Sequence, residues 1–168
     1  MPGGDRDLGK DFDALVGQLD YPMFIVITRS LAGELAGCLV GFATQCSVGP
    51  PRFLICLSQA NRTHQIAREA AAIGVHLVPS SAAGLAELFG GETGDEVDKF
   101  AHCEWEEGER GVPLLTECPN AFVGSILERH DLGDHVGLVL EPIAVRRGGA
   151  QAELGFGRAR QIEPGHQP

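Results

Sequence analysis

Apolar and polar positions along the chain predict a helix followed by a series of short strands. In residues 5–19 an apolar side chain returns every three or four positions and the first turn is acidic, which indicates an amphipathic helix. The apolar positions of this helix are Leu8, Phe12, Leu15, Val16 and Leu19. Residues 21–28, YPMFIVIT, are continuously apolar and too short for a surface helix. They therefore indicate a buried strand.

Turn signals and two more apolar runs continue this strand pattern. The segment RSLAGELAG predicts a turn, and strands are expected at residues 38–46 and 52–58. Between these strands, Pro50 and Pro51 interrupt any hydrogen-bonded ladder, because proline has no amide hydrogen. The first three strands thus follow one another without an intervening helix.

Helical spacing returns in the middle of the chain. A helix is expected at residues 63–72, a strand at 73–78, and a second helix at 82–89, which a pair of glycines ends. Residues 92–117 lack a clear period, and their acidic stretch EWEEGER is expected to form a solvated loop or the tip of a hairpin. The two predicted helices are thus short insertions between strands.

Two further strands close the predicted fold. They are expected at residues 121–128 and 136–145, joined by RHDLGDH. The tail, residues 148–168, has too little apolar mass to pack alone, so it is expected to be mobile or to lie on a partner, leaving a core of about residues 21–147. About six short strands with inserted helices predict a mainly β barrel, because a doubly wound sheet would alternate strand and helix throughout.

Composition and net charge narrow the class of protein, its compartment and its partners. A chain of 168 residues with 43% hydrophobic residues fits one soluble domain, and no signal peptide or membrane span is apparent. Five cysteines without a CxxC pair are expected to be reduced thiols in the cytoplasm, and no metal-ligand spacing is seen. A formal net charge of −10 argues against nucleic acid or an anionic membrane as the main partner.

The segment GCLVGFATQCSVGPP, residues 37–51, carries small side chains where a buried strand usually carries large ones. Small residues inside a strand permit close approach of another backbone or of a flat ligand. Tight packing at a barrel corner and a ligand groove both explain this composition, and the residues themselves leave the two open.

A second candidate site is the stretch SQANRTHQIA, where a strand ends and a helix begins. Amide groups at a helix start together with Ser58, Asn61 and Thr63 form an anion site in many proteins, and Arg62 adds a positive charge. The alternative is simple N-capping by Asn61 or Thr63 beside an exposed arginine.

Seven pieces in order, GCLVGFATQCSVGPP, RFLICLS, NRTHQIA, LAELFGG, DKF, GVPLL and GDH, give the chain a resemblance to a known family. Between about residues 21 and 145 it resembles the flavin reductase family, whose fold is the FMN-binding split barrel. The resemblance implies NAD(P)H-dependent reduction of FMN or FAD, with NADH or NADPH as co-substrate. It also implies a homodimer that supplies reduced flavin to a partner monooxygenase.

The resemblance further implies a set of site residues. The flavin ring and ribityl chain are expected along Gly41, Phe42, Ala43, Thr44, Gln45, Cys46 and Ser47. The flavin phosphate is expected at Ser58, Asn61, Arg62 and Thr63, with Arg62 as the main contact. His135 is expected beside the nicotinamide, and Phe100 is expected to wall that side.

Several residues have a simpler interpretation. Cys46 is expected to be a small buried hydrophobe, although it would touch a bound ring if the groove holds flavin. Asp98 and Lys99 are expected to be an exposed pair without a chemical role. No chemical partner is evident for His64, His76, His102, His130 or His166.

Two other functions stay open from the sequence. A split barrel of this kind could bind flavin tightly as a redox carrier or sensor without nicotinamide turnover. It could instead use a deazaflavin as an oxidoreductase. The sequence does not separate FMN from FAD or NADH from NADPH.

Overall fold

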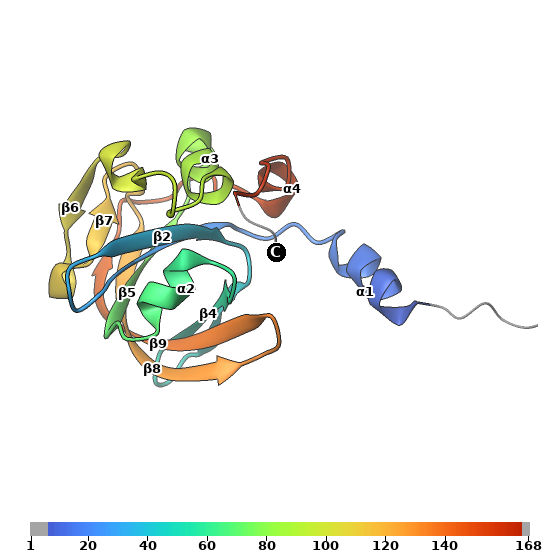
Figure 1. Cartoon of the computed structure of the whole chain (residues 1–168), viewed down its shortest axis with the longest axis horizontal. Helices are drawn as coiled ribbons and strands as arrows, with labels where there is room; N and C mark the ends of the chain where they lie inside the picture. Colours follow the sequence, from blue (N-terminus) through green and yellow to red (C-terminus); the bar gives the residue numbers. More distant parts are fainter. Residues whose placement is uncertain (1–6, 166–168) are drawn as a thin grey trace, which may run out of the picture.

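The computed structural model describes residues 7–165, and a curled antiparallel sheet forms most of this part of the chain (Figure 1). The strands are β1 Phe24–Arg29, β2 Leu35–Val40, β3 Ala43–Ser47, β4 Arg52–Ser58, β5 Ala72–Leu77, β6 Trp105–Glu107, β7 Pro113–Leu115, β8 Ala121–Asp131 and β9 His135–Arg146. The α-helices are α1 Leu8–Val16, α2 Arg62–Ala67, α3 Ala83–Gly91 and α4 Phe156–Ala159, and 3-10 turns occur at Lys99–Ala101 and Glu109–Gly111.

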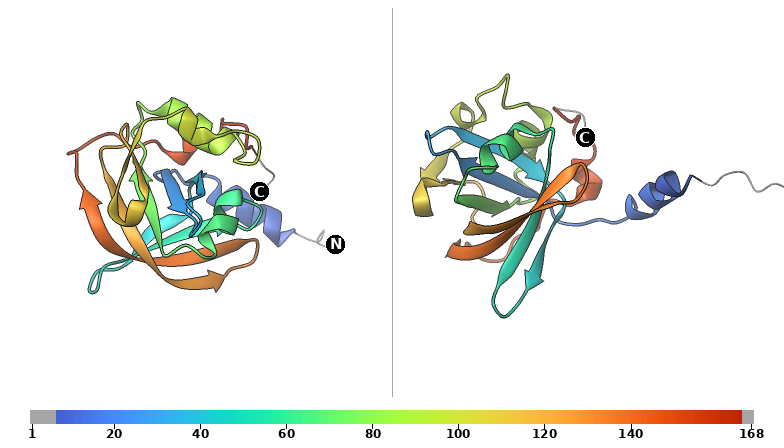
Figure 2. Two further views of the ribbon diagram at one scale, coloured as in Figure 1. Left: turned by 60° about the vertical axis from the view of Figure 1, so that its left-hand side comes forward. Right: turned by 60° about the horizontal axis from the view of Figure 1, so that its bottom comes forward.

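The main sheet has seven strands in the order β2-β1-β5-β8-β9-β4-β3. All its pairs are antiparallel, and β8 and β9 form a long hairpin with two register shifts. The sheet curls so that α2 lies within the curve, between β2 and β4 (Figures 1 and 2). The predicted mainly β architecture with inserted helices is therefore confirmed.

Strand β1 is apolar from Phe24 to Ile27 because both faces of the sheet are covered there. Phe24 and Val26 pack inside the curl with Ala67 of α2, whereas Ile25 and Ile27 pack on the outer face with α3. Successive side chains of a strand point to opposite faces, so a strand between two apolar layers reads as a continuous apolar run. This arrangement explains the pattern of residues 21–28.

The expected strand at residues 38–46 is instead two strands, which is a correction. The chain leaves β2 at Val40 and begins β3 at Ala43, on the opposite end of the sheet order. Helix α2 is also shorter than expected and ends at Ala67, because β5 begins at Ala72 opposite Ser125 of β8. The pairing of strands in the sheet sets both boundaries. The local spacing of apolar residues carries no information about that pairing.

The described part of the tail, residues 148–165, packs on its own chain, so the expectation that the tail is mobile or lies on a partner is wrong for these residues. Leu154 is buried, its amide donates to Val78 O at 2.8 Å, and its carbonyl accepts from Met23 N at 2.8 Å. The amide of Phe156 donates to Tyr21 O, also at 2.8 Å. Backbone hydrogen bonds compensate for the low apolar content that suggested a free tail.

Two peripheral elements match their predictions. EWEEGER forms part of the β6–β7 hairpin, with Glu106 and Glu107 exposed on it. Helix α1 forms as expected and stands apart from the sheet (Figure 1). Within residues 7–165, no helix is long and apolar enough to cross a membrane.

Candidate active site

Three hollows adjoin one another beside strand β2 and the start of α2. Their volumes are about 320, 260 and 230 Å³, and Asn61 lines all three. The largest reaches His135 and Phe42, and the second extends to Glu34 and Phe100. Together they form an elongated cleft where β2, β4 and α2 meet.

Aromatic rings surround the 320 Å³ hollow. Phe42 lies between Tyr21, at 6.5 Å between ring centroids, and His135, at 5.3 Å. Phe156 from the tail stacks on Tyr21 at 4.7 Å with an angle of 11° between the rings. The side chain of Phe42 is 56% exposed, so the ring borders the hollow without being part of the core. This hollow suits a flat, largely apolar group.

His135 is positioned by the β4–β9 pairing, in which it lies opposite Ser58. Its ring Nδ1 is 2.7 Å from the Asp134 carboxylate, and its side chain is 21% exposed. The hydrogen bond from His135 lowers the pKa of Asp134 below its ordinary value. A carboxylate accepts, so Nδ1 is the donor and the ring orientation is fixed.

The absence of a side chain at Gly41 leaves room for the ring of Tyr21. A Cβ added at Gly41 would lie 2.7 Å from Tyr21 Cε2 and 3.3 Å from Met23 Sδ. The close approach that the sequence indicated is therefore real, but Tyr21 occupies the space next to this glycine. Gly41 itself still lines the hollow.

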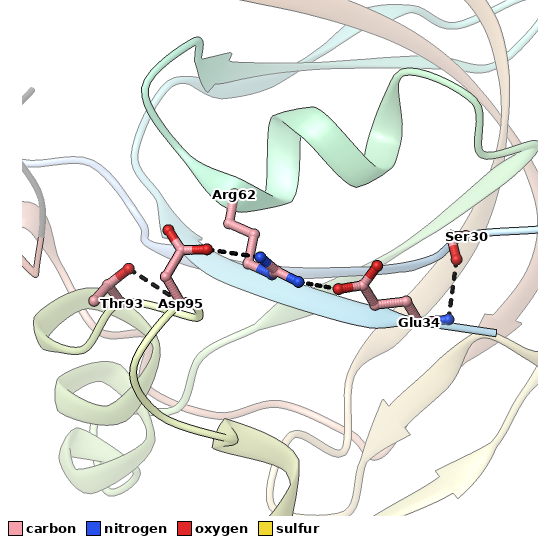
Figure 3. Close-up of polar contacts among 5 residues, drawn as sticks. All are labelled: Ser30, Glu34, Arg62, Thr93 and Asp95. Atoms are coloured by element: carbon pink, nitrogen blue, oxygen red, sulfur yellow. Dashed lines mark hydrogen bonds and ion pairs between the residues drawn. The ribbon is translucent and has the colours of Figure 1, made fainter. Parts of the chain in front are cut away.

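Arg62 is held between two carboxylates from different segments (Figure 3). Its Nη1 donates to Asp95 Oδ1 at 2.6 Å, and its Nη2 pairs with Glu34. Asn61 caps α2, since its Oδ1 accepts from Thr63 N at 2.9 Å. The capping alternative is thus realised at Asn61, whereas Arg62 is half-buried and ion-paired.

Lys99 is buried, so the expected exposed pair with Asp98 is wrong. Its Nζ donates to Gly37 O at 3.2 Å and to Phe89 O at 3.1 Å. Burial lowers the pKa of Lys99 and raises the pKa of the neighbouring Cys38 to about 11, although Thr63 and Lys99 both favour the thiolate. At neutral pH the Cys38 thiol is therefore protonated.

Thr63 and Phe100 lie at the edges of the cleft. Thr63 is buried beneath the 260 Å³ hollow and hydrogen-bonds the Cys38 thiol. The Phe100 ring lines the same hollow and packs edge-on against Phe89, at 5.8 Å, and Trp105, at 6.4 Å. Phe100 thus combines a core contact with exposure to the cleft.

The remaining predicted residues lie on β3, outside the lining of the three hollows. These residues are Ala43, Thr44, Gln45, Cys46 and Ser47. Strand β3 is an edge strand, and the tip of its hairpin with β4 projects from the body (Figure 2, right). Cys46 is exposed, so the expectation of a buried hydrophobe is wrong at this position.

Several lining residues were missed by sequence reasoning, and four of them have a clear part in the cleft. Tyr21 and Phe156 form one wall, and Glu34 and Asp95 hold the arginine. Only the aromatic character of Tyr21, at the start of a predicted strand, offered a signal. Phe156 reaches the cleft through the packing of the tail, and Asp95 reaches it through the loop after α3. Among residues 7–165, no group of three or more potential ligands could hold a metal ion.

A curled antiparallel sheet with a helix in its curve and a cleft at its rim defines a split-barrel protein. Residues 16–163 match the family described as "Flavin reductase like domain". The chain therefore belongs to the flavin reductase family, as its motifs predicted.

Individual relatives agree with this assignment. The FMN reductase (NADH) RutF of Stutzerimonas stutzeri is 34% identical over 150 residues, covering 89% of this chain and 85% of the relative. The ferric-chelate reductase (NAD(P)H) of Archaeoglobus fulgidus is 27% identical over 128 residues and covers 75% of each chain.

Solved structures share the fold. The NADH:FAD oxidoreductase SgcE6 of Streptomyces globisporus has a TM-score of 0.81 at 23% identity, covering 92% of this chain and 93% of the other. An FMN-binding protein from Thermus thermophilus with bound 1-cyclohex-2-enone has a TM-score of 0.71 at 26% identity, covering 86% and 74%.

Proposed function

We propose that this protein is an NAD(P)H:flavin oxidoreductase that reduces FMN or FAD. The observation that carries the proposal is the continuity of the aromatic-lined hollow at Phe42 and His135 with the Arg62 hollow, through Asn61. A flavin has the same sequence of parts, a flat ring followed by a polar chain and a phosphate. Relatives with reductase names at up to 34% identity support the activity.

The residues of the cleft fit a flavin by their chemistry. Tyr21, Phe42 and Phe156 offer apolar faces for the ring, and Ser58 and Asn61 offer polar groups at the middle of the cleft. Arg62 is the cationic group best placed for a phosphate, and Phe100 lies beyond it. The predicted contacts on β3 are not part of this lining.

The reaction needs orientation more than acid–base catalysis. A flavin held in the cleft would supply the acceptor for the hydride of a reduced nicotinamide, so the chemistry would belong to the two ring systems. The protein must hold them face to face and exclude water. In this protein, Asp134 orients the His135 ring, whose Nε2 is then the nitrogen that a ligand can reach.

Purified protein with NADH or NADPH and added FMN or FAD tests the proposal directly. We expect oxidation of the reduced nicotinamide to depend on both the protein and the flavin, measured by loss of its absorbance. A protein that retains flavin through dialysis but oxidises neither nicotinamide would instead be a flavin-binding carrier.

Replacing His135 by alanine should lower kcat/KM for the nicotinamide about tenfold while leaving the flavin Kd nearly unchanged, because one positioning contact is lost. Steady-state kinetics and flavin titration measure the two quantities. His130→Ala is the matched control, since His130 lies on the exposed part of β8 and pairs with Glu128. An equal loss of flavin and nicotinamide affinity in His135→Ala would show a structural role.

The assembly that we propose is a homodimer that passes reduced flavin to a monooxygenase. Helix α1 supports a self-association surface, because none of its residues is buried and its apolar side chains form one stripe. Leu8, Phe12 and Leu15 are 78%, 61% and 63% exposed. Support for a monooxygenase partner is a structural neighbour named nitrilotriacetate monooxygenase component B, from Mycobacterium thermoresistibile.

Replacing both Phe12 and Leu15 by serine should therefore shift the protein from dimer toward monomer, because the stripe loses its two central apolar side chains. Light scattering after size-exclusion chromatography measures the mass. The control pair Asp11→Ser and Asp13→Ser changes the same helix outside the stripe. A dimer that is equally stable in both double variants would exclude α1 from the interface.

A further inference from the structure

The guanidinium of Arg62 is already neutralised within the chain. Asp95 pairs with Nη1 at 2.6 Å and Glu34 pairs with Nη2 (Figure 3). The Arg62 side chain is 30% exposed, so the two ion pairs are partly shielded from solvent. An anion that binds Arg62 must therefore compete with carboxylates that are already in place.

The two carboxylates are anchored differently. Glu34 directly precedes β2, and its backbone amide donates to Ser30 Oγ at 3.0 Å. Asp95 lies in the loop after α3, where its amide donates to Thr93 Oγ1 at 3.3 Å, and its side chain is 61% exposed, against 47% for Glu34. Asp95 is thus the carboxylate that can leave with less loss of buried contact.

The loop that contains Asp95 rests on the stem of Arg62. A Cβ added at Gly94 would lie 3.1 Å from Arg62 Cδ. The glycine therefore lets the loop approach the arginine closely, which positions the next residue beside the guanidinium. The ion pair and this close approach together fix Asp95 over Arg62.

The surrounding charges oppose an anion as well. Four carboxylates line this hollow, those of Glu34, Asp95, Glu96 and Asp98. Two cationic groups face them, and one of these, Lys99, donates to two backbone carbonyls. With Arg62 paired, the hollow presents net negative charge to an approaching phosphate.

We propose that Asp95 is a specificity-determining residue that makes Arg62 a competed anion site. A phosphate-bearing flavin binds there by displacing Asp95, so the ion pair lowers affinity for FMN without affecting riboflavin, which has no phosphate. This inference rests on the proposed function, in which the flavin phosphate lies beside Arg62. Glu34 stays paired and keeps the guanidinium oriented when Asp95 leaves.

Titration of FMN and of riboflavin, followed by flavin fluorescence, tests the proposal. Asp95→Asn should tighten FMN binding about three- to fivefold, the range expected for a partly exposed ion pair, and leave riboflavin unchanged. Asp95→Glu should keep the wild-type affinity. Glu96→Gln removes a charge from the same loop without an ion pair to Arg62, so its effect should be below about twofold.

The double variant of Arg62→Ala and Asp95→Asn distinguishes direct competition by Asp95 for Arg62 from a general electrostatic effect of the Asp95 charge on FMN binding. Arg62→Ala should weaken FMN binding but not riboflavin binding, and Asp95→Asn should have no effect in that background. The inference is overturned if Asp95→Asn changes FMN binding no more than Glu96→Gln does, or if its gain persists without Arg62. If Arg62→Ala leaves FMN affinity unchanged, the phosphate contact itself fails. If neither flavin binds any variant, the proposed function fails with it.

Discussion

Replacing His76 by alanine should lower the free energy of unfolding by about 4 kcal/mol, the largest effect that we expect from one substitution. His76 is fully buried in β5, and its Nδ1 lies 2.9 Å from Ile25 O in the neighbouring strand β1. Its Nε2 accepts from Leu115 N of β7 at 3.1 Å. The ring thus connects the small β6–β7 sheet to the main sheet, although no partner for His76 was evident from the sequence.

The expected loss has two causes. The alanine would leave a cavity, and it would leave the Leu115 amide and one acceptor position of the Ile25 carbonyl without their partners. Urea unfolding measures the change. His102→Ala, at an exposed histidine, should change stability by less than about 0.5 kcal/mol. A similarly small change in His76→Ala would contradict the structural role.

The same residue predicts a pH dependence of stability. An amide donor toward Nε2 requires neutral imidazole, and burial lowers the pKa of His76 from 6.5 to about 4. Below pH 6.5 the unfolded chain binds a proton that the folded chain refuses, so stability falls as the pH falls from 6.5 to about 4. The slope is about 1.4 kcal/mol per pH unit.

The variant His76→Gln isolates this contribution, because glutamine does not titrate. The stability of wild type should approach or fall below that of His76→Gln as the pH falls through this window, and the difference should level off below pH 4. Parallel stability curves for the two proteins would show that His76 binds protons equally in both states.

Replacing Lys99 by methionine should lower the free energy of unfolding by about 2 to 3 kcal/mol. The ammonium group donates to the carbonyl of Phe89, in the last turn of α3, and to the carbonyl of Gly37 in the edge strand β2. Carbonyls in the last turn of a helix have no partner within it, so a buried lysine donor there stabilises the helix end. Methionine keeps the apolar stem and removes both hydrogen bonds.

Removing the buried charge of Lys99 is itself favourable. The loss of stability is therefore smaller than the summed cost of leaving two buried carbonyls without hydrogen bonds. Chemical unfolding measures it, and Lys10→Met on exposed α1 is the control, with an expected change below about 0.5 kcal/mol. If Lys99→Met is as stable as wild type, the two carbonyls find other donors and the lysine is dispensable. A stable variant with changed flavin affinity would place Lys99 in the function of the cleft instead.

Local patterns were sufficient where one short segment contains the whole cause. The apolar stripe of α1 and strand β4 follow from spacing and turn residues within a few positions of each other. For the β6–β7 hairpin, the acidic stretch EWEEGER indicated only a solvated loop or a hairpin tip. The capping of α2 by Asn61 is equally local. Family motifs added the identity of the fold, because they span most of the chain.

Patterns failed where distant segments meet. The close contact at Gly41 depends on Tyr21, the burial of Lys99 depends on the end of α3, and the position of Leu154 depends on backbone groups beside β1 and β5. No residue near these positions in the sequence encodes its partner. The ion pairs of Arg62 were missed for the same reason.

The sequence by itself determined the family, the mainly β architecture and the candidate residues for a ligand site. Tertiary structure alone decided which of these residues share the cleft, because the chain crosses from β2 to the far edge of the sheet before β3 begins. It also decided that Arg62 is paired with Glu34 and Asp95. Charge compensation between segments far apart in the chain is a property of the folded surface, and periodicity along the sequence does not record it.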